Sequence, residues 1–208
     1  MTDISKTISS LKKNNFDVYH VKNKKEAKEI FFKEIFPEIN PKTVSYGDSL
    51  SAESTGILED LKKMEGINFI ETFDENATQK EQIQASKDAL HVDLFIAGSN
   101  AVTTTGLLVN LDMVGNRIAG IVFGPRRVVL VIGKNKITEN LEGAMERVRS
   151  IAPKNAARHP ELNLPCQKTG ECIDCSSPKR ICNSWLISEK SYPKGRIKII
   201  LVEGDLGL

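Results

Sequence analysis

The sequence predicts an α/β protein with a mainly parallel sheet flanked by helices, and two observations favour this fold class. First, short apolar runs typical of strands alternate with segments of helical periodicity over the first half of the 208-residue chain. Second, Val92–Ala97 is almost continuously apolar, as expected of a strand that is covered on both faces. A chain of this length buries a sizeable core, so residues 1–208 are expected to form one domain.

Helices and strands are expected to alternate through the N-terminal half. The expected helices are Ile4–Asn14, Lys24–Phe36, Ala52–Met64 and Thr78–Leu90, and the expected strands are Phe16–Val21, Thr43–Tyr46, Asn68–Glu71 and Val92–Ala97. The second helix should stop before Pro37, because proline disfavours helical backbone at the residue that precedes it. Alternation of this kind is typical of βαβ units, which form parallel sheets through right-handed crossovers.

The pattern changes in the second half of the chain. Three apolar runs follow one another with too few residues between them for helices: Leu107–Leu111, Ile118–Phe123 and Val128–Ile132. We expect adjacent strands or hairpins there. Thr138 can cap a helix over Glu139–Ser150, and the three prolines of Ala152–Pro165 predict a loop. Arg196–Val202 is expected to be the last strand; if it lies at a sheet edge it could pair with a second copy, so the sequence is compatible with a homo-oligomer.

Composition excludes several classes of partner. Lysine and arginine number 29 against 27 acidic residues, so there is no global charge that would favour nucleic acid. No stretch approaches the roughly 20 apolar residues of a membrane span, and the first residues have no apolar signal core. The expected compartment is therefore the cytoplasm.

Two polar loops that follow expected strands form the predicted ligand site. In open α/β sheets, ligands bind beyond the carboxyl ends of the strands, where glycines allow close approach and short side chains form hydrogen bonds. Such residues also make ordinary turns, and the second loop is the stronger candidate because an asparagine and three threonines directly follow the apolar strand. The candidate ligand-binding residues are Gly47, Asp48, Ser49, Gly98, Ser99, Asn100, Thr103, Thr104, Thr105, Gly106, Asn116 and Arg117.

Four cysteines lie close together in segment 160–185, which is inserted before the last strand: Cys166, Cys172, Cys175 and Cys182. Clustered thiols in a reducing compartment suggest a metal rather than disulfides. Four thiolates suit either tetrahedral zinc or an iron–sulfur cluster, and the spacing does not select between them. Four unmetallated thiols are the third interpretation. A nucleophilic cysteine paired with His159 is disfavoured, because one histidine does not explain four cysteines.

Part of the chain resembles a known superfamily. The order of a strand, the loop Gly47-Asp48-Ser49-Leu50-Ser51, a helix, and later VDLFIAG with its polar loop resembles the ribose-5-phosphate isomerase and CoA-transferase-like proteins, over about Thr43 to Gly133. The resemblance implies a Rossmann-like sheet. Those isomerases carry acidic residues in the second loop, where this chain has Asn100, Ala101 and Thr103. An amide and a hydroxyl cannot act as a general base near neutral pH, so sugar-phosphate isomerisation is not expected.

A second resemblance covers nearly the whole chain. It rests on GSNAVTTTGLLVNLDMVGNRIAGIVFGPRRVVLVIGKNKI, APKNAARH, PCQKTGECIDCSSPKRICN and KIILVEGDLGL, which are similar to the lactate-utilisation (LUD-domain) family. Members often carry an acidic residue where this chain has Thr103-Thr104-Thr105, so this loop is expected to bind or orient a ligand rather than abstract a proton.

The family resemblance implies a redox role in the oxidation of lactate to pyruvate beside separate iron–sulfur partner proteins, and it favours a [4Fe–4S] cluster over zinc. It identifies no catalytic residue. A small carboxylate ligand such as lactate would find cationic partners among Arg117, Arg126, Arg127 and Lys134, with Arg117 the strongest candidate. Two other hypotheses stay open. One is a zinc-stabilised small-molecule-binding or regulatory subunit. The other is a non-redox enzyme acting on a phosphorylated or CoA-linked substrate, with Asp48, Glu53 or Asp112 as its carboxylate.

Overall fold

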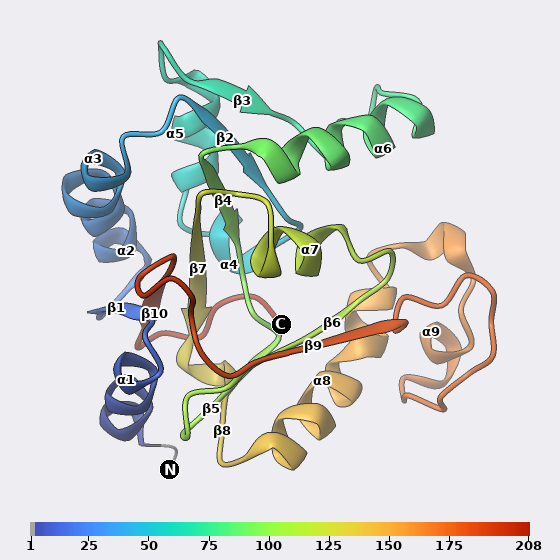
Figure 1. Cartoon of the computed structure of the whole chain (residues 1–208). Coiled ribbons are helices and arrows are strands. Elements are labelled where there is room, and N and C mark those ends of the chain that lie inside the picture. Colours follow the sequence, from blue (N-terminus) through green and yellow to red (C-terminus); the bar gives the residue numbers. More distant parts are fainter. Residues whose placement is uncertain (1–2) are drawn as a thin grey trace.

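A six-stranded parallel sheet forms the centre of the molecule (Figure 1). The computed structural model describes residues 3–208. In spatial order the strands are β1 (Asp17–Val21), β10 (Ile197–Val202), β7 (Arg127–Gly133), β4 (Leu94–Ala97), β2 (Thr43–Tyr46) and β3 (Asn68–Ile70). Every neighbouring pair is parallel, so the expected fold class and most of the expected strands are confirmed.

A second, four-stranded sheet lies beside the first. Its order is β8 (Ile137–Thr138), β5 (Ala101–Thr103), β6 (Leu108–Asp112) and β9 (Ser184–Ser188). β5 and β6 form an antiparallel hairpin, and β6 also pairs antiparallel with β9. β9 was not expected from the sequence. It begins at Ser184, at the end of the cysteine-rich segment, and ties that segment to the core, with Trp185 packed against the cluster that contains Val109 and Val148.

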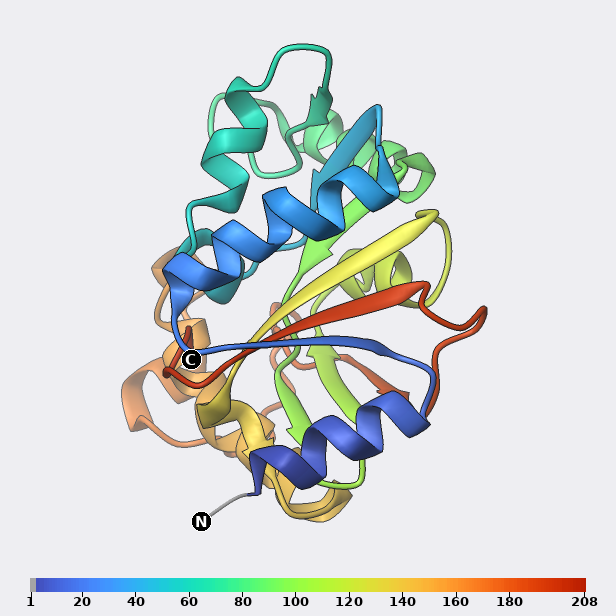
Figure 2. The same ribbon diagram turned by 90° about the vertical axis from the view of Figure 1, so that its left-hand side faces the viewer.

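Alternating side chains of the central strands fill two separate cores. In β7, Val129 and Val131 face one core while Val128 and Leu130 face the other. Helices α2 (Lys24–Ile30), α3 (Phe36–Ile39), α4 (Leu50–Glu53) and α5 (Ile57–Lys63), with the π-helical turn Phe31–Ile35, cover the first face. Helices α1 (Ile4–Lys13) and α7 (Asn116–Val122) and the second sheet cover the other. Figure 2 shows the fanned strands with helices in front of and behind them.

The remaining helices lie around the second sheet and the upper edge of the first. They are α6 (Gln79–Asp88), α8 (Leu141–Ala156), α9 (Pro165–Thr169) and the 3-10 turns Ala89–His91, Lys134–Lys136 and Pro160–Leu162. α8 packs on the face of the second sheet that points away from the central sheet, through Ala144 and Val148. Within the described range 3–208, no helix combines the length and the apolar character needed to cross a membrane.

Several expected elements differ in the structure. The expected strand Ile118–Phe123 is instead helix α7, where Gly120 lets the helix approach β4 so closely that a Cβ would lie 2.8 Å from the Phe95 ring. The expected helix Ala52–Met64 breaks into α4 and α5 at Gly56, whose φ of 72° lies in the left-handed region. β10 is hydrogen-bonded on both sides, to β1 and β7, so this strand is not at a sheet edge and has no free edge for pairing with a second copy.

Two prolines are also accommodated within helices, contrary to expectation. The helix that was expected to end before Pro37 continues to Ile39, because a π-helical turn precedes Pro37 and places it in the first turn of α3. The expected helix Glu139–Ser150 runs on through Pro153 to Ala156. Its cap is Asn140, whose side chain accepts a hydrogen bond from the Gly143 N–H, and not Thr138.

The β5–β6 turn is fastened to α1, and this contact gives a stability prediction. Gly106 has φ 83° and lies so close to α1 that a Cβ would be 2.8 Å from the Ser10 carbonyl carbon. Gly66 has a similar φ of 79° but nothing within 4 Å. Gly66→Ala should therefore cost only the left-handed backbone penalty of about 1–2 kcal/mol, and Gly106→Ala should cost clearly more because α1 must also move. Urea unfolding of both variants measures the difference in their free energies of unfolding. Equal decreases would show that α1 moves away from residue 106 at no measurable cost.

Candidate functional site

The two polar loops meet at the point where the chain reverses its direction across the sheet. After β2 the chain continues to β3 at one edge, whereas after β4 it continues through the second sheet to β7 on the other side. The Gly47 N–H donates to the Ile96 carbonyl at 2.9 Å. A Cβ on Gly98 would lie 2.6 Å from Ser49 Oγ. The loops therefore adjoin at a topological switch point, where parallel α/β sheets most often bind ligands.

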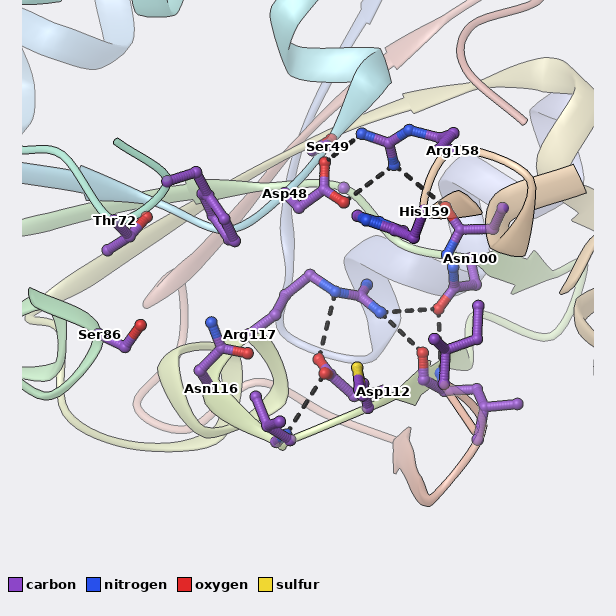
Figure 3. Close-up of a pocket in the computed structure, with 18 of the residues that line it drawn as sticks. Asp48, Ser49, Thr72, Ser86, Asn100, Asp112, Asn116, Arg117, Arg158 and His159 are labelled. Carbon is purple, nitrogen blue, oxygen red and sulfur yellow. Dashed lines mark hydrogen bonds and ion pairs between the residues drawn. The ribbon is translucent and has the colours of Figure 1, made fainter. Parts of the chain in front are cut away.

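A cavity of about 760 Å³ opens directly beyond these strand ends. Its walls come from the two loops, from α6 and α7, from the end of β6, and from α8 with the residues that follow it (Figure 3). Apolar side chains lie at its rim, among them Ile83 and Val114, which are 51% and 75% exposed. A volume of this size suits a small organic ligand and exceeds what a three-carbon acid needs.

Arg117 organises one wall of the cavity. Its Nη1 donates to Asn110 Oδ1 at 3.0 Å, and its Nη2 donates to Asn100 Oδ1 at 3.0 Å and to the Leu111 carbonyl at 2.9 Å. Its Nε lies 3.4 Å from Asp112 Oδ2. Burial lowers the pKa of Arg117, and the charge of Asp112 opposes this shift. Three of the five guanidinium N–H groups donate hydrogen bonds to protein oxygens and the Nε–H faces the Asp112 carboxylate, so one N–H on Nη1 has no protein partner among residues 3–208.

An ion pair forms a second part of the wall. Arg158 donates to both carboxylate oxygens of Asp48, at 2.9 and 2.8 Å, and so joins the region after α8 to the loop after β2. Figure 3 shows this pair above the Arg117 network, with His159 between them. Burial, followed by the charge of Asp48, raises the pKa of Glu53, but Glu53 is not among the residues that line the cavity. Since Asp48 and Asp112 are each paired with an arginine, the structure offers little support for either as a free base.

Lys136 is a cavity residue that the sequence did not single out. It lies on the 3-10 turn directly after β7, is only 7% exposed, and donates from Nζ to Ser51 Oγ at 2.8 Å. Burial, and then the positive charges of Arg147 and Arg117, lower its pKa to about 7. The signal available in the sequence was its position: GKNK follows the apolar run of β7, so a basic side chain had to lie near the carboxyl end of a central strand.

The candidate residues divide into two groups. Those that line the cavity are Asp48, Ser49, Gly98, Ser99, Asn100, Asn116 and Arg117. Gly47 lies behind them, with its Cβ position 2.8 Å from Arg117 Cγ. The candidates Arg126, Arg127 and Lys134 are not among the lining residues, and Arg126 instead faces Asp93 at 3.4 Å.

The threonine run does not contribute to the cavity wall. Thr103, Thr104, Thr105 and Gly106 are not among its lining residues. Instead, Thr103 Oγ lies 2.7 Å from Thr105 Oγ and accepts from the Leu107 N–H at 3.0 Å, while Thr104 Oγ donates to the Glu139 carbonyl at 2.8 Å. These hydroxyls stabilise the turn from β5 to β6.

All four cysteines line one small cavity of about 20 Å³. The thiols are free, and burial raises the pKa of Cys166 and of Cys182. Across residues 3–208, no three histidine, cysteine or acidic side chains converge closely enough to hold a metal ion. The donor set nevertheless suits a metal that binds thiolates, and Arg180, which also lines this cavity, has a buried Nε without a hydrogen-bond partner among the described residues.

The cysteine cavity and the large cavity share a wall. Ala152, Ile181 and Cys182 line both of them. Side chains of helix α8 and of the end of the cysteine-rich segment therefore lie between the two spaces and line both.

Comparison with known proteins gives one family and one fold. The sequence model for the LUD domain matches residues 4–202. No curated protein matches the chain. A crystal structure of a DUF162 family protein from Deinococcus radiodurans is similar, with a TM-score of 0.54 and 12% sequence identity; the match covers 96% of this chain and 95% of that one.

Proposed function

The chain belongs to the LUD-domain family, and from this premise we propose that it is an iron–sulfur redox component in the oxidation of lactate to pyruvate. The observation that carries the proposal is the wall shared by the two cavities. Ala152, Ile181 and Cys182 touch both the space between the four cysteines and the space beyond the sheet. An electron-carrying group held by the cysteines would then lie next to the cavity that takes the small carboxylate.

Cys166, Cys172, Cys175 and Cys182 are the residues that would hold the cluster. A [4Fe–4S] cluster, when bound, accepts and passes on single electrons. The unpartnered Arg180 Nε beside the cavity supports an anionic occupant, because a buried N–H without an acceptor is costly. Iron–sulfur partner proteins, which the family implies, would exchange electrons with this exposed segment.

In the large cavity, the residues around the strand ends would bind and orient the acid. Asn100 and Ser49 offer hydrogen-bonding groups at the switch point, and Arg117 has one N–H left for a carboxylate. The apolar rim around Ile83 and Val114 would limit access of water to the bound ligand. The cavity is larger than lactate, so a second, organic component could bind beside it.

Anaerobic purification tests the cluster. The protein is expected to be brown, to contain iron and acid-labile sulfide, and to lose its visible absorbance on addition of dithionite. Cys175→Ser should remove most of the iron, because it removes one thiolate ligand. Ser176→Ala, at the exposed neighbouring position, should leave the iron content unchanged.

A colourless protein with stoichiometric zinc would contradict the redox proposal. It would favour the second candidate, a zinc-stabilised subunit that binds a small molecule, which is consistent with a large cavity formed mainly by the α/β core. In that case a chelator should lower the melting temperature without changing any visible spectrum.

A further inference from the structure

Lys136 is a buried cation without a carboxylate partner. Its ammonium group has three N–H donors, and one of them reaches Ser51 Oγ at 2.8 Å. Within the described residues, no aspartate or glutamate lies within ion-pair distance of its Nζ. Lys198 shows the usual arrangement: it is 1% exposed, and its Nζ lies 2.9 Å from Asp17 and 2.7 Å from Glu38. Buried charges are normally paired in this way.

The groups that face Lys136 add positive charge rather than compensate it. Helix α4 contributes only the Ser51 hydroxyl, while Arg147 from α8 and Arg117 from α7 both repel the ammonium. Arg147 is held by main-chain oxygens, those of Asn135 at 3.0 Å, Asn100 at 2.6 Å and Leu208 at 3.0 Å. The charged groups that act on the Lys136 ammonium are therefore both cationic, and its remaining N–H donors have no carboxylate partner among residues 3–208.

We propose that Lys136 anchors the carboxylate of the ligand in the large cavity and takes up a proton from solvent when the ligand binds. The identity of this ligand as a 2-hydroxy or 2-oxo acid rests on the proposed function. In the free protein the amine is close to half protonated near neutral pH, since its pKa is about 7. A carboxylate beside it favours the ammonium form. One proton from the buffer joins Nζ, and no other bond changes.

Titration calorimetry with pyruvate tests this coupling. At a pH slightly above 7, the binding heat should vary with the ionisation enthalpy of the buffer and report net proton uptake by the protein. The dissociation constant should rise as the pH increases from about 7 to about 9, because the protonated form becomes scarce. L-lactate and D-lactate should behave alike in this respect, whereas lactamide, which carries no charge, should show neither effect.

Three variants separate anchoring from a structural role. Lys136→Arg keeps a permanent cation, so it should bind pyruvate without proton uptake. Lys136→Met should weaken binding by roughly 10- to 100-fold, as expected for loss of a charged hydrogen bond. Lys134→Met is the matched control, because Lys134 is exposed two residues away, and it should match the wild type in both measurements.

The inference is overturned if wild-type protein binds these acids without proton exchange, if it binds none of them, or if proton uptake persists in Lys136→Arg. The measurement on the wild-type protein is informative whether or not the variants fold. Iron content decides the proposed function separately: an iron-free protein that binds carboxylates through Lys136 would refute the redox role and leave this anchor in place.

Discussion

Replacing Arg117 by methionine is expected to lower the free energy of unfolding by about 3–5 kcal/mol, because it breaks a buried ion pair from one side. The Arg117 side chain is 13% exposed and that of Asp112 is 8% exposed, so the carboxylate would be left in the protein interior without its counter-charge. Asn100 and Asn110 would each lose a donor as well. Urea unfolding followed by circular dichroism measures the loss.

A second substitution identifies the cause of this loss. Asp112→Asn combined with Arg117→Met removes the unpaired charge, so it should recover part of the stability. Arg126→Met is the matched control: Arg126 also faces an aspartate at 3.4 Å, but its side chain is 49% exposed, and the cost should stay within about 1 kcal/mol. Equal losses for Arg117→Met and Arg126→Met would show that burial of the Asp112 pair has little energetic consequence.

The central sheet could be predicted because its strands have a distinctive pattern. β7 and β4 are buried on both faces, so each reads as an unbroken apolar run. Helix α7 was mistaken for a strand because IAGIVF is equally apolar, and length was the only criterion available to separate them. A tertiary contact favours the helix over a strand. Gly120 packs against the Phe95 ring of the neighbouring strand, and the local sequence pattern does not encode this contact.

The meeting of the two ligand loops and the position of Arg117 could be expected from the sequence, whereas the path of the threonine run and the burial of Lys136 could not. A parallel sheet places the carboxyl ends of β2 and β4 at the same edge, and because the two strands are neighbours Ser49 lies beside Gly98. The threonine run follows the same strand and has the same polar composition, yet it turns away into the β5–β6 hairpin. The position of a turn within a loop depends on which strand the chain pairs with next, and the second sheet was not foreseen.

The grouping of the four cysteines could be predicted from the sequence, but the metal that they would bind could not. Their proximity in sequence was enough to expect them around one space, and they do line one cavity. Their identity as ligands stays a prediction, because the order and spacing of thiols in a loop suit more than one metal. The contact of Cys182 with the large cavity depends on how α8 packs, which the sequence did not reveal.

If the ligand supplies the counter-charge of Lys136, the buried ammonium should destabilise the ligand-free protein. Burial depresses the pKa of Lys136 from 10.5 to about 7. Below about pH 7, both the folded and the unfolded chain carry the proton, so the full cost of the buried charge is present. Between about pH 7 and 10.5 only the unfolded chain holds the proton, so the contribution of Lys136 to the free energy of unfolding rises with pH. Above 10.5 both states are neutral and the cost disappears.

Lys136→Met should therefore stabilise the ligand-free protein by about 1–4 kcal/mol at or below neutral pH, and this gain should vanish as the pH approaches 10.5. Urea unfolding of wild type and variant at matched pH values isolates the difference from other titrating groups. Lys198→Met is the control with the opposite sign, because two carboxylates raise the pKa of Lys198 despite its burial, and its removal should destabilise the protein near pH 7. If Lys136→Met were destabilising at neutral pH, Lys136 would be a structural group that its protein surroundings already stabilise, and it would not need a bound carboxylate.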